Sequence, residues 1–315
     1  MNNIMKKILI TEFMEQNSIN FIAKKFDITY NPKLCENVKD LISQIHLFDA
    51  IIVRNKTQVN ESVLQKARNL RFIGRLGVGL DNIDTIFCKK NNIFVQPATG
   101  MNADSVAEYV MNCTLSLLKN IPLLHQGTIT GQWPRNSIES RELQGKTIGL
   151  LGFGIIGKKV SKLAKAFGSK IIACDPFVPS SMERKYNISL VEQQEIFETA
   201  DVMTIHLPLN NETKDLLNYS SFSLMKKKPI IINSSRGSIV NERDLIRAYK
   251  ENLINGFALD VFESEPIKEI FYKEINSTMN CILTPHVAGV TNESNTRVSQ
   301  FIVEKLIKFF EKIKN

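Results

Sequence analysis

Short apolar runs rich in isoleucine, valine and leucine alternate along this chain with amphipathic segments. Apolar runs of about four to eight residues are typical of strands covered on both faces, and the segments between them are typical of helices. One series of such runs occupies the stretches 6–11, 49–57, 70–79 and 92–99. A second series occupies 147–154, 170–177, 201–209, 229–237, 256–263 and 281–289. The pattern predicts an α/β protein with two doubly wound parallel-sheet domains.

Two long segments have the spacing of amphipathic helices. The first runs from Ser105 to about Leu124, and Ser105 with Glu108 forms a capping box that predicts a helix start at Ser105. The polar stretch 125–146 then separates the two series of strands. The second helix lies at the C-terminus, where apolar residues recur at helical spacing: Val298, Phe301, Ile302, Leu306, Phe309 and Phe310.

The composition is that of an ordinary globular protein. The 315 residues suffice for two domains, and 43% of them are hydrophobic and 23% charged. The five cysteines lack the spacing of metal ligands, so we expect reduced thiols, no metal and a cytoplasmic location. The apolar run near the N-terminus is too short for a signal peptide, and no run approaches the roughly 20 residues of a membrane span. No membrane partner is therefore expected.

The net charge of +8 raises the question of nucleic-acid binding. The lysines are dispersed, however, and the densest run, 226–228, lies in a loop before a strand. This pattern favours a solvated surface and no nucleic-acid partner. A positive field also favours the approach of an anionic substrate.

A glycine triplet, Gly152, Gly154 and Gly157, stands between an apolar strand and an amphipathic helix. Such a G-x-G-x-x-G turn makes a tight bend, lets the backbone approach a pyrophosphate and offers helix N–H groups, although a plain turn has the same pattern. Asp175 ends the next strand, where an acidic residue binds the adenosine ribose hydroxyls and repels a 2′-phosphate. The pattern predicts NAD rather than NADP.

Polar residues follow late strands at Arg236, Glu265 and His286. Because the carboxyl ends of parallel strands line the ligand crevice, these side chains are expected to converge beside a nicotinamide. Each has an alternative explanation. Arg236 could form an ordinary ion pair, Glu265 could cap a loop, and His286 could be a histidine with satisfied hydrogen bonds near Pro285. Together they predict an acid–base pair with an anion clamp.

These motifs resemble the D-isomer-specific 2-hydroxyacid dehydrogenases along essentially the whole chain. The matching stretches are 74–84, 102–110, 145–157, 206–213, 233–237, 258–266 and 284–289. The resemblance implies a flavodoxin-like substrate domain of residues 1–100, completed by 288–315. It also implies a Rossmann-type NAD-binding domain of residues 101–287, with a cleft between the two.

The resemblance also implies the role of each site residue. His286 is the acid–base group, Glu265 orients its imidazole, and Arg236 holds the substrate carboxylate and the adjacent oxygen. Further cofactor contacts are expected at Ile155, Ile156, His206, Pro208, Thr213, Ser234 and Asp260, the last with the nicotinamide carboxamide. Substrate contacts are expected at Val78, Gly79 and Asn102, the first two through backbone N–H groups. Many relatives have an arginine where this chain has Ile155, which removes one pyrophosphate contact.

The substrate is expected to be a small anionic 2-hydroxy or 2-oxo acid. Arg54 and Arg75 follow strands of the substrate domain, and Arg135 is placed to reach the site of a neighbouring subunit. A second anionic group on the substrate explains such arginines, so we favour oxidation of 3-phosphoglycerate to 3-phosphohydroxypyruvate. The stretch 284–299 is closer to subgroups that act on sulfolactate or on hydroxypyruvate and glyoxylate, which keeps those acids open. Structural ion pairs are the alternative role for the arginines.

Two further classes share this resemblance. The C-terminal-binding-protein corepressors use the fold as an NADH-sensing binding protein, but this chain lacks their long tails. Formate dehydrogenases pair the histidine with glutamine, whereas Glu265 here favours hydroxy acids. The resemblance also implies a homodimer through the nucleotide domain, formed by the helix at Ser105 and the loop at Trp133.

Overall fold

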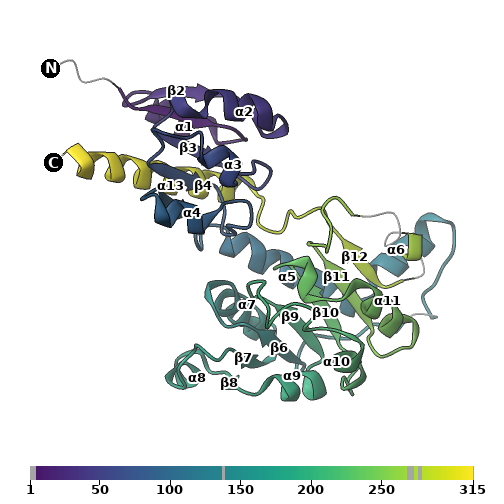
Figure 1. The fold of residues 1–315 in the computed structure, drawn as a ribbon. Coiled ribbons are helices and arrows are strands. Elements are labelled where there is room, and N and C mark those ends of the chain that lie inside the picture. The colour runs from purple at the N-terminus through teal and green to yellow at the C-terminus, as the bar shows by residue number, and fades with distance from the viewer. Residues whose placement is uncertain (1–4, 137–138, 268–272, 276–278, 315) are drawn as a thin grey trace. The chain divides into compact units, whose positions relative to one another are not determined.

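The computed structural model describes residues 5–136, 139–267, 273–275 and 279–314 (Figure 1). The chain divides into two compact units, of which unit 1 comprises residues 1–102 and 290–315 and unit 2 comprises residues 103–289. Among the helices of the described ranges, none combines the length and the apolar content needed to cross a membrane.

Unit 1 contains a five-stranded parallel sheet in the order β2-β1-β3-β4-β5, which is the flavodoxin-like order. Its strands are β1 (Lys7–Ile10), β2 (Asp27–Tyr30), β3 (Ala50–Val53), β4 (Phe72–Arg75) and β5 (Phe94–Pro97). The apolar pattern predicts four of these strands but misses β2. This edge strand is largely exposed and partly polar, so it carries no continuous apolar run.

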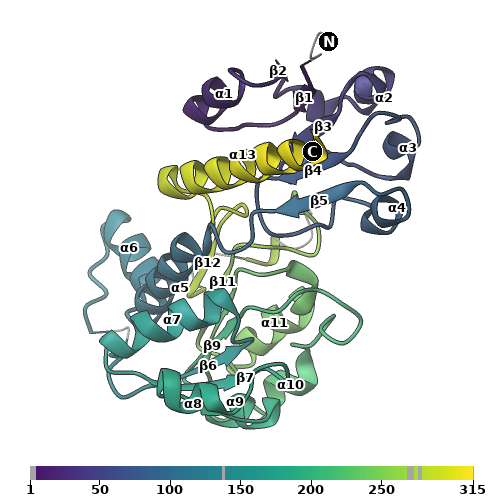
Figure 2. The same ribbon diagram turned by 90° about the vertical axis from the view of Figure 1, so that its left-hand side faces the viewer.

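Helices cover both faces of this sheet, because alternate strand residues point to opposite faces. On one face, Ile8 and Ile52 pack with α1 (Gln16–Ile22) and α13 (Asn292–Lys314), which lie side by side (Figure 2). On the other face, Leu9 and Ile73 pack in a second cluster with the helices and turns that connect the strands. These are η1 (Leu34–Glu36), α2 (Val38–Gln44), η2 (Ile45–Leu47), α3 (Glu61–Leu64) and α4 (Thr85–Lys90).

Unit 2 contains a seven-stranded parallel sheet in the order β12-β11-β10-β9-β6-β7-β8. Its strands are β6 (Thr147–Leu151), β7 (Lys170–Cys174), β8 (Ser189–Leu190), β9 (Val202–Ile205), β10 (Ile230–Asn233), β11 (Gly256–Leu259) and β12 (Cys281–Leu283). Counted from β8, this is the Rossmann order with one extra strand at its end. The strand order reverses between β6 and β9, which is the switch point where such sheets bind ligands.

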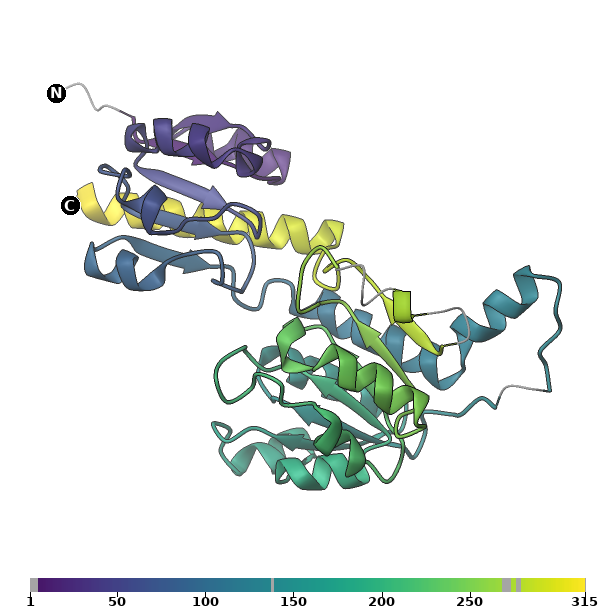
Figure 3. The same ribbon diagram turned by 45° about the vertical axis from the view of Figure 1, so that its right-hand side comes forward.

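The core of unit 2 lies on both faces of its sheet. One cluster joins the strands to α5 (Ala103–Leu118), α7 (Ile155–Ala166) and the end of α8 (Ser181–Tyr186). The other joins them to α9 (Gln193–Thr199), α10 (Tyr219–Ser223), η3 (Gly237–Ile239) and α11 (Glu242–Lys250). The remaining helix, α6 (Ile121–Ile129), extends away from this core together with the loop that follows it (Figure 3).

The predicted helix from Ser105 to Leu124 is wrong in its start and in its end. α5 begins at Ala103, and Ser105 is a buried residue inside it, so the Ser105–Glu108 pattern is not a capping box. α5 ends at Leu118, and Asn120 has a left-handed backbone (φ 52°) that precedes α6. Pro122 then stands in the first turn of α6, where its missing N–H costs nothing.

Candidate active site

The turn between β6 and α7 carries the three glycines of the predicted fingerprint. Gly152 has φ +95°, a conformation that favours glycine. A Cβ on Gly157 would lie 2.5 Å from the Gly152 carbonyl oxygen. Only glycine therefore allows α7 to pack this closely against the turn that follows β6. A Cβ on Gly154 would meet no atom within 4 Å, and this open position leads directly into α7. An open turn at a helix N-terminus fits a pyrophosphate.

Asp175 lies directly after β7 and beside this turn. Its carboxylate accepts hydrogen bonds from the backbone N–H groups of Phe153 (2.8 Å) and Phe177 (3.0 Å). These bonds fix the carboxylate, and its oxygens keep further lone pairs that can accept from ribose hydroxyls. Ile155, the first residue of α7, is 48% exposed, and Ile156 packs partly into the core.

The loop after β9 carries three of the expected cofactor contacts. The Thr213 hydroxyl donates to the carbonyl of Pro208 (2.7 Å), which closes this loop on itself. His206 lies at the start of the loop, with its Nε2 2.6 Å from the Thr204 hydroxyl. Burial lowers the pKa of His206 to about 4, so its imidazole is neutral at neutral pH.

Ser234 supplies a test of whether these residues fit a dinucleotide. Its hydroxyl oxygen is buried and has no hydrogen-bond partner among the residues that the structure describes. A buried polar group without a partner is costly, so such a group at the end of β10 indicates a place for a ligand atom. The buried Ser234 hydroxyl and the open position at Gly154 are therefore both compatible with a bound NAD molecule.

The turn after β10 places Arg236. The fully buried Asn233 ends the strand, and its side chain donates to the Arg236 carbonyl (2.8 Å) and accepts from the Ser235 N–H (3.0 Å). A Cβ on Gly237 would lie 1.9 Å from the carbonyl carbon of Phe262. The Arg236 turn is therefore in direct backbone contact with the loop that leads to Glu265.

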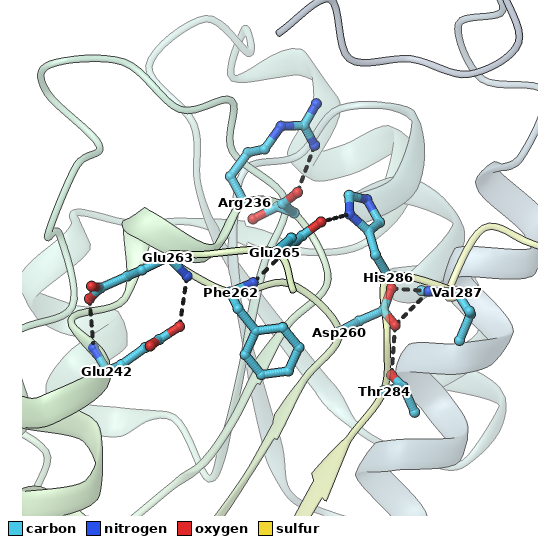
Figure 4. Close-up of polar contacts among 11 residues, drawn as sticks. Arg236, Glu242, Asp260, Phe262, Glu263, Glu265, Thr284, His286 and Val287 are labelled. Carbon is cyan, nitrogen blue, oxygen red and sulfur yellow. Dashed lines mark hydrogen bonds and ion pairs between the residues drawn. The ribbon is translucent and has the colours of Figure 1, made fainter. Parts of the chain in front are cut away.

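Figure 4 shows Glu265 and His286 facing each other, with the Arg236 turn beside them and the Arg236 guanidinium donating to the Ser235 carbonyl (2.6 Å). His286 Nδ1 lies 2.8 Å from Glu265 Oε2, and the two side chains are 39% and 38% exposed. The other carboxylate oxygen, Oε1, accepts from the Phe262 N–H (3.3 Å). Nδ1 is therefore the ring nitrogen that contacts the carboxylate, and Nε2 is the one outside this contact.

Asp260 is fully buried and bonds to the loop that carries His286. Its Oδ1 accepts from the Thr284 hydroxyl (2.6 Å) and from the Val287 N–H (2.8 Å), and its Oδ2 accepts from the Ala288 N–H (2.7 Å) (Figure 4). All of these donors lie in the loop that holds His286. The contact of Asp260 with a nicotinamide carboxamide stays a prediction.

In unit 1, the loop after β3 presents Arg54. The buried carboxylate of Glu12 accepts from the backbone N–H groups of Arg54 (2.8 Å), Lys56 (3.1 Å) and Thr57 (2.9 Å). The Arg54 guanidinium donates to Asn295 Oδ1 (3.1 Å) and lies 5.7 Å from the centre of the Phe13 ring. Burial lowers the pKa of Arg54 and Glu12 opposes this shift, so the guanidinium is a partly desolvated cation.

The other residues expected to contact the substrate differ in their burial and in their hydrogen bonds. Arg75 donates to the Leu76 carbonyl (3.1 Å) and folds over Gly77, beside the exposed Val78 and the half-buried Gly79. The carbonyl oxygen of Asn102 is buried without a hydrogen-bond partner in the described part of the chain. Arg135 is exposed in the loop after α6, in unit 2.

Several residues that hold the candidate site in place were not predicted from the sequence. Glu12, Tyr109, Asn233 and Thr284 were not proposed, although the last three lie inside the matching stretches 102–110, 233–237 and 284–289, and Asn233 and Thr284 also lie at strand ends. A polar residue where a buried strand ends is the signal that could have identified these two. Tyr109 lies inside the matching stretch 102–110, but an aromatic residue on an amphipathic helix is ordinarily part of the core, so its pattern does not indicate a polar role.

A Rossmann-type sheet with a hydrogen-bonded histidine and glutamate beyond its last strands has the architecture of a dinucleotide-dependent oxidoreductase. Comparison with known proteins identifies the family. The family model described as D-isomer specific 2-hydroxyacid dehydrogenase, NAD binding domain, matches residues 111–288. The chain belongs to the D-isomer specific 2-hydroxyacid dehydrogenase family, whose members are NAD-dependent oxidoreductases.

Individual relatives differ in how much of their length is matched. The chain is 37% identical to (S)-sulfolactate dehydrogenase of Chromohalobacter salexigens, over 96% of this chain and 97% of that protein. It is 35% identical to D-3-phosphoglycerate dehydrogenase of Methanocaldococcus jannaschii, over 96% of this chain but only 57% of that protein. Among solved structures, D-lactate dehydrogenase of Aquifex aeolicus, complexed with NAD and lactic acid, matches with a TM-score of 0.85 and 27% identity, covering 97% of this chain and 95% of that one.

The low pKa of His206 makes stability depend on pH. Its value of about 4 in the folded chain lies below the ordinary 6.5, so between these values the unfolded chain binds more protons than the folded one. The contribution of His206 to the free energy of unfolding is therefore fully present above pH 6.5 and is lost as the pH drops toward 4. From pH 7 to pH 5, the free energy of unfolding of wild type should fall about 1–2 kcal/mol more than that of His206→Gln. Urea unfolding of both proteins at each pH measures this, and equal falls would contradict the low pKa.

Proposed function

We propose that this chain transfers a hydride between NAD and carbon 2 of a small 2-hydroxy acid that carries a second anionic group, a sulfonate or a phosphate. The observation that carries the proposal is the His286–Glu265 hydrogen bond beside the Arg236 turn. NAD, when bound, supplies a nicotinamide that takes up or returns the hydride. Unit 2 would hold this cofactor, and unit 1 would act as the substrate domain.

His286 and Arg236 perform separate tasks in this proposal. With its Nδ1 bonded to Glu265, His286 takes the hydroxyl proton at Nε2 during oxidation and returns it during reduction, and the carboxylate stabilises the protonated ring. Arg236 presents a planar fork of N–H groups that matches a carboxylate with an adjacent oxygen. The cofactor contacts at Gly154, Asp175 and Ser234 position the nicotinamide rather than the acid.

Replacing the acid–base group tests this assignment. His286→Ala should lower kcat by about 10²–10⁴-fold while the NAD dissociation constant, from fluorescence titration, is unchanged. His46→Ala, which removes an exposed imidazole in unit 1, is the control and should keep wild-type kcat. Arg236→Lys keeps the charge but loses the fork, so its kcat/KM should also fall by more than about 10-fold. Near-normal turnover of His286→Ala would exclude it from the chemistry and favour a binding role.

The second anionic group is supported by the way Arg54 is held. Glu12 fixes the backbone of its loop, and Asn295 and Phe13 fix the side chain, so the cation is positioned at little entropic cost. A preorganised, partly desolvated guanidinium suits a sulfonate or a phosphate. The sulfolactate enzyme matches over nearly its full length and favours the sulfonate, whereas oxidation of 3-phosphoglycerate remains the second candidate. Hydroxypyruvate and glyoxylate lack this second anion.

A substrate panel separates these acids. With NAD, kcat/KM should be highest for sulfolactate or 3-phosphoglycerate and lower for lactate and glycerate. Arg54→Ala should lower kcat/KM for the dianionic acids by about 10–100-fold and change that for lactate by less than about 3-fold, because only the former lose a charge-assisted contact. Repeating the panel with NADP tests the role of Asp175. A preference for mono-anionic acids would contradict the second-anion proposal, and equal efficiency with NADP would contradict the role of Asp175.

We also propose that the chain forms a homodimer through unit 2. None of the residues of α6 is buried, and Ile121, Ile129 and Trp133 are 50%, 62% and 79% exposed. Large apolar side chains on one protruding segment favour burial against a second copy. The position of Arg135 two residues after Trp133 would then bring it near that copy.

Light scattering tests the dimer. Wild type should have about twice the chain mass of 35.7 kDa, and Trp133→Glu should shift the protein toward the monomer because a charge replaces a ring that the dimer would bury. Phe21→Glu, on an exposed aromatic residue of α1 in unit 1, is the matched control and should remain dimeric. A monomeric wild type would contradict the proposal.

A further inference from the structure

The backbone of His286 has an unusual conformation that something must hold. Its φ is +57°, in the left-handed region that residues other than glycine rarely adopt. Such conformations persist only where the surrounding structure imposes them, and they cluster at functional sites. His286 is also partly exposed, so packing of its own side chain does not impose the conformation.

One buried carboxylate bonds to residues on both sides of His286. Asp260 accepts from Thr284, two residues before it, and from the N–H groups of Val287 and Ala288, directly after it (Figure 4). The His286 N–H in turn donates to the Thr284 carbonyl (3.0 Å). The loop is therefore fixed before and after the histidine by the same fully buried group.

The network extends from Asp260 to helix α5. The Thr284 hydroxyl has one proton, and a carboxylate can only accept, so this proton is directed to Asp260. The hydroxyl of Tyr109, 2.7 Å from Thr284 Oγ1, must then be the donor to Thr284. Burial raises the pKa of Tyr109, so the phenol stays protonated and able to donate.

We infer that Tyr109 and Thr284 are positioning residues for His286, acting through Asp260 to hold the imidazole in line with Glu265. The inference rests on the function proposed above, since it concerns the same acid–base group. Both residues contribute hydroxyl groups to the network, and neither belongs to the Arg236–Glu265–His286 group itself. A small displacement of a catalytic group lowers turnover strongly without a matching loss of substrate binding.

Hydroxyl-deleting variants and their conservative counterparts test this inference. Thr284→Val keeps the shape but removes the hydroxyl, and kcat should fall by about 10–100-fold with KM and the NAD dissociation constant within about 2-fold of wild type. Thr284→Ser restores a hydroxyl and should recover most of the loss. Tyr109→Phe removes one oxygen atom and should lower kcat by about 3–10-fold.

Matched controls remove the same groups elsewhere in unit 2. Thr114→Val deletes a buried hydroxyl that donates to the Val110 carbonyl within α5. Tyr219→Phe deletes a phenol that donates to Glu251. Both should keep wild-type kcat, so that a loss seen also in the controls would indicate a general effect of hydroxyl removal and overturn the inference.

A spectroscopic readout separates this inference from the proposed function. The chain has four histidines, so ¹⁵N-histidine labelling gives few signals, and the His286 Nδ1 proton is assigned by its absence in His286→Gln. In Thr284→Val and Tyr109→Phe this signal should shift or broaden, and in Thr284→Ser and the controls it should match wild type. An unchanged signal with wild-type kcat in Tyr109→Phe would overturn the positioning role even while His286→Ala stays inactive. A wild type without dehydrogenase activity would instead contradict the proposed function. The His286 Nδ1 signal would still show whether Thr284 and Tyr109 position the imidazole.

Discussion

The backbone of Phe262 lies so close to Gly237 that no side chain fits between them, and the relative placement of the Arg236 and Glu265 loops depends on this contact. Arg236 directly precedes that glycine, and Glu265 lies at the end of the loop that begins at Phe262. Two hydrogen bonds connect this loop to the start of α11 (Figure 4). The Glu263 N–H donates to the Glu242 carboxylate (2.7 Å), and the Glu242 N–H donates to the Glu263 carboxylate (3.1 Å). Two loops from different strands therefore behave as one body, and His286 joins it through Glu265.

In both units a buried carboxylate shapes a loop that carries a candidate site residue. In unit 1, Glu12 accepts backbone N–H groups around Arg54, and in unit 2, Asp260 accepts those that follow His286. Burying a carboxylate is costly unless donors surround it, and here the donors come from the loop itself. Because the buried carboxylate needs these N–H donors, the backbone of the loop must adopt the conformation that points them toward it. Apolar packing could not direct a short exposed turn in this way, because it lacks directionality.

Much of the fold could be predicted because continuous apolar runs report strands that are covered on both faces. The prediction failed where local pattern and tertiary environment disagree. Ser105 resembles a helix cap but lies buried inside α5, and β2 is an exposed edge strand without an apolar run. The candidate residues Arg236, Glu265 and His286 could be proposed because each lies beyond the end of a strand. What holds them could not be named, since the Tyr109–Thr284 bond joins residues 175 positions apart and no local pattern encodes it.

The path of the chain through unit 1 has a consequence for the order of events during synthesis. The sheet of unit 1 is formed by residues 7–97, but one of its faces is covered in part by α13, which buries Ile302 and Leu306 against that sheet. All of unit 2 is contiguous and leaves the ribosome before α13 does. Unit 2 can therefore complete its core first, while one face of the earlier-made sheet stays only partly covered, by α1, until α13 arrives. The part of the molecule that is translated first is thus the part that is finished last.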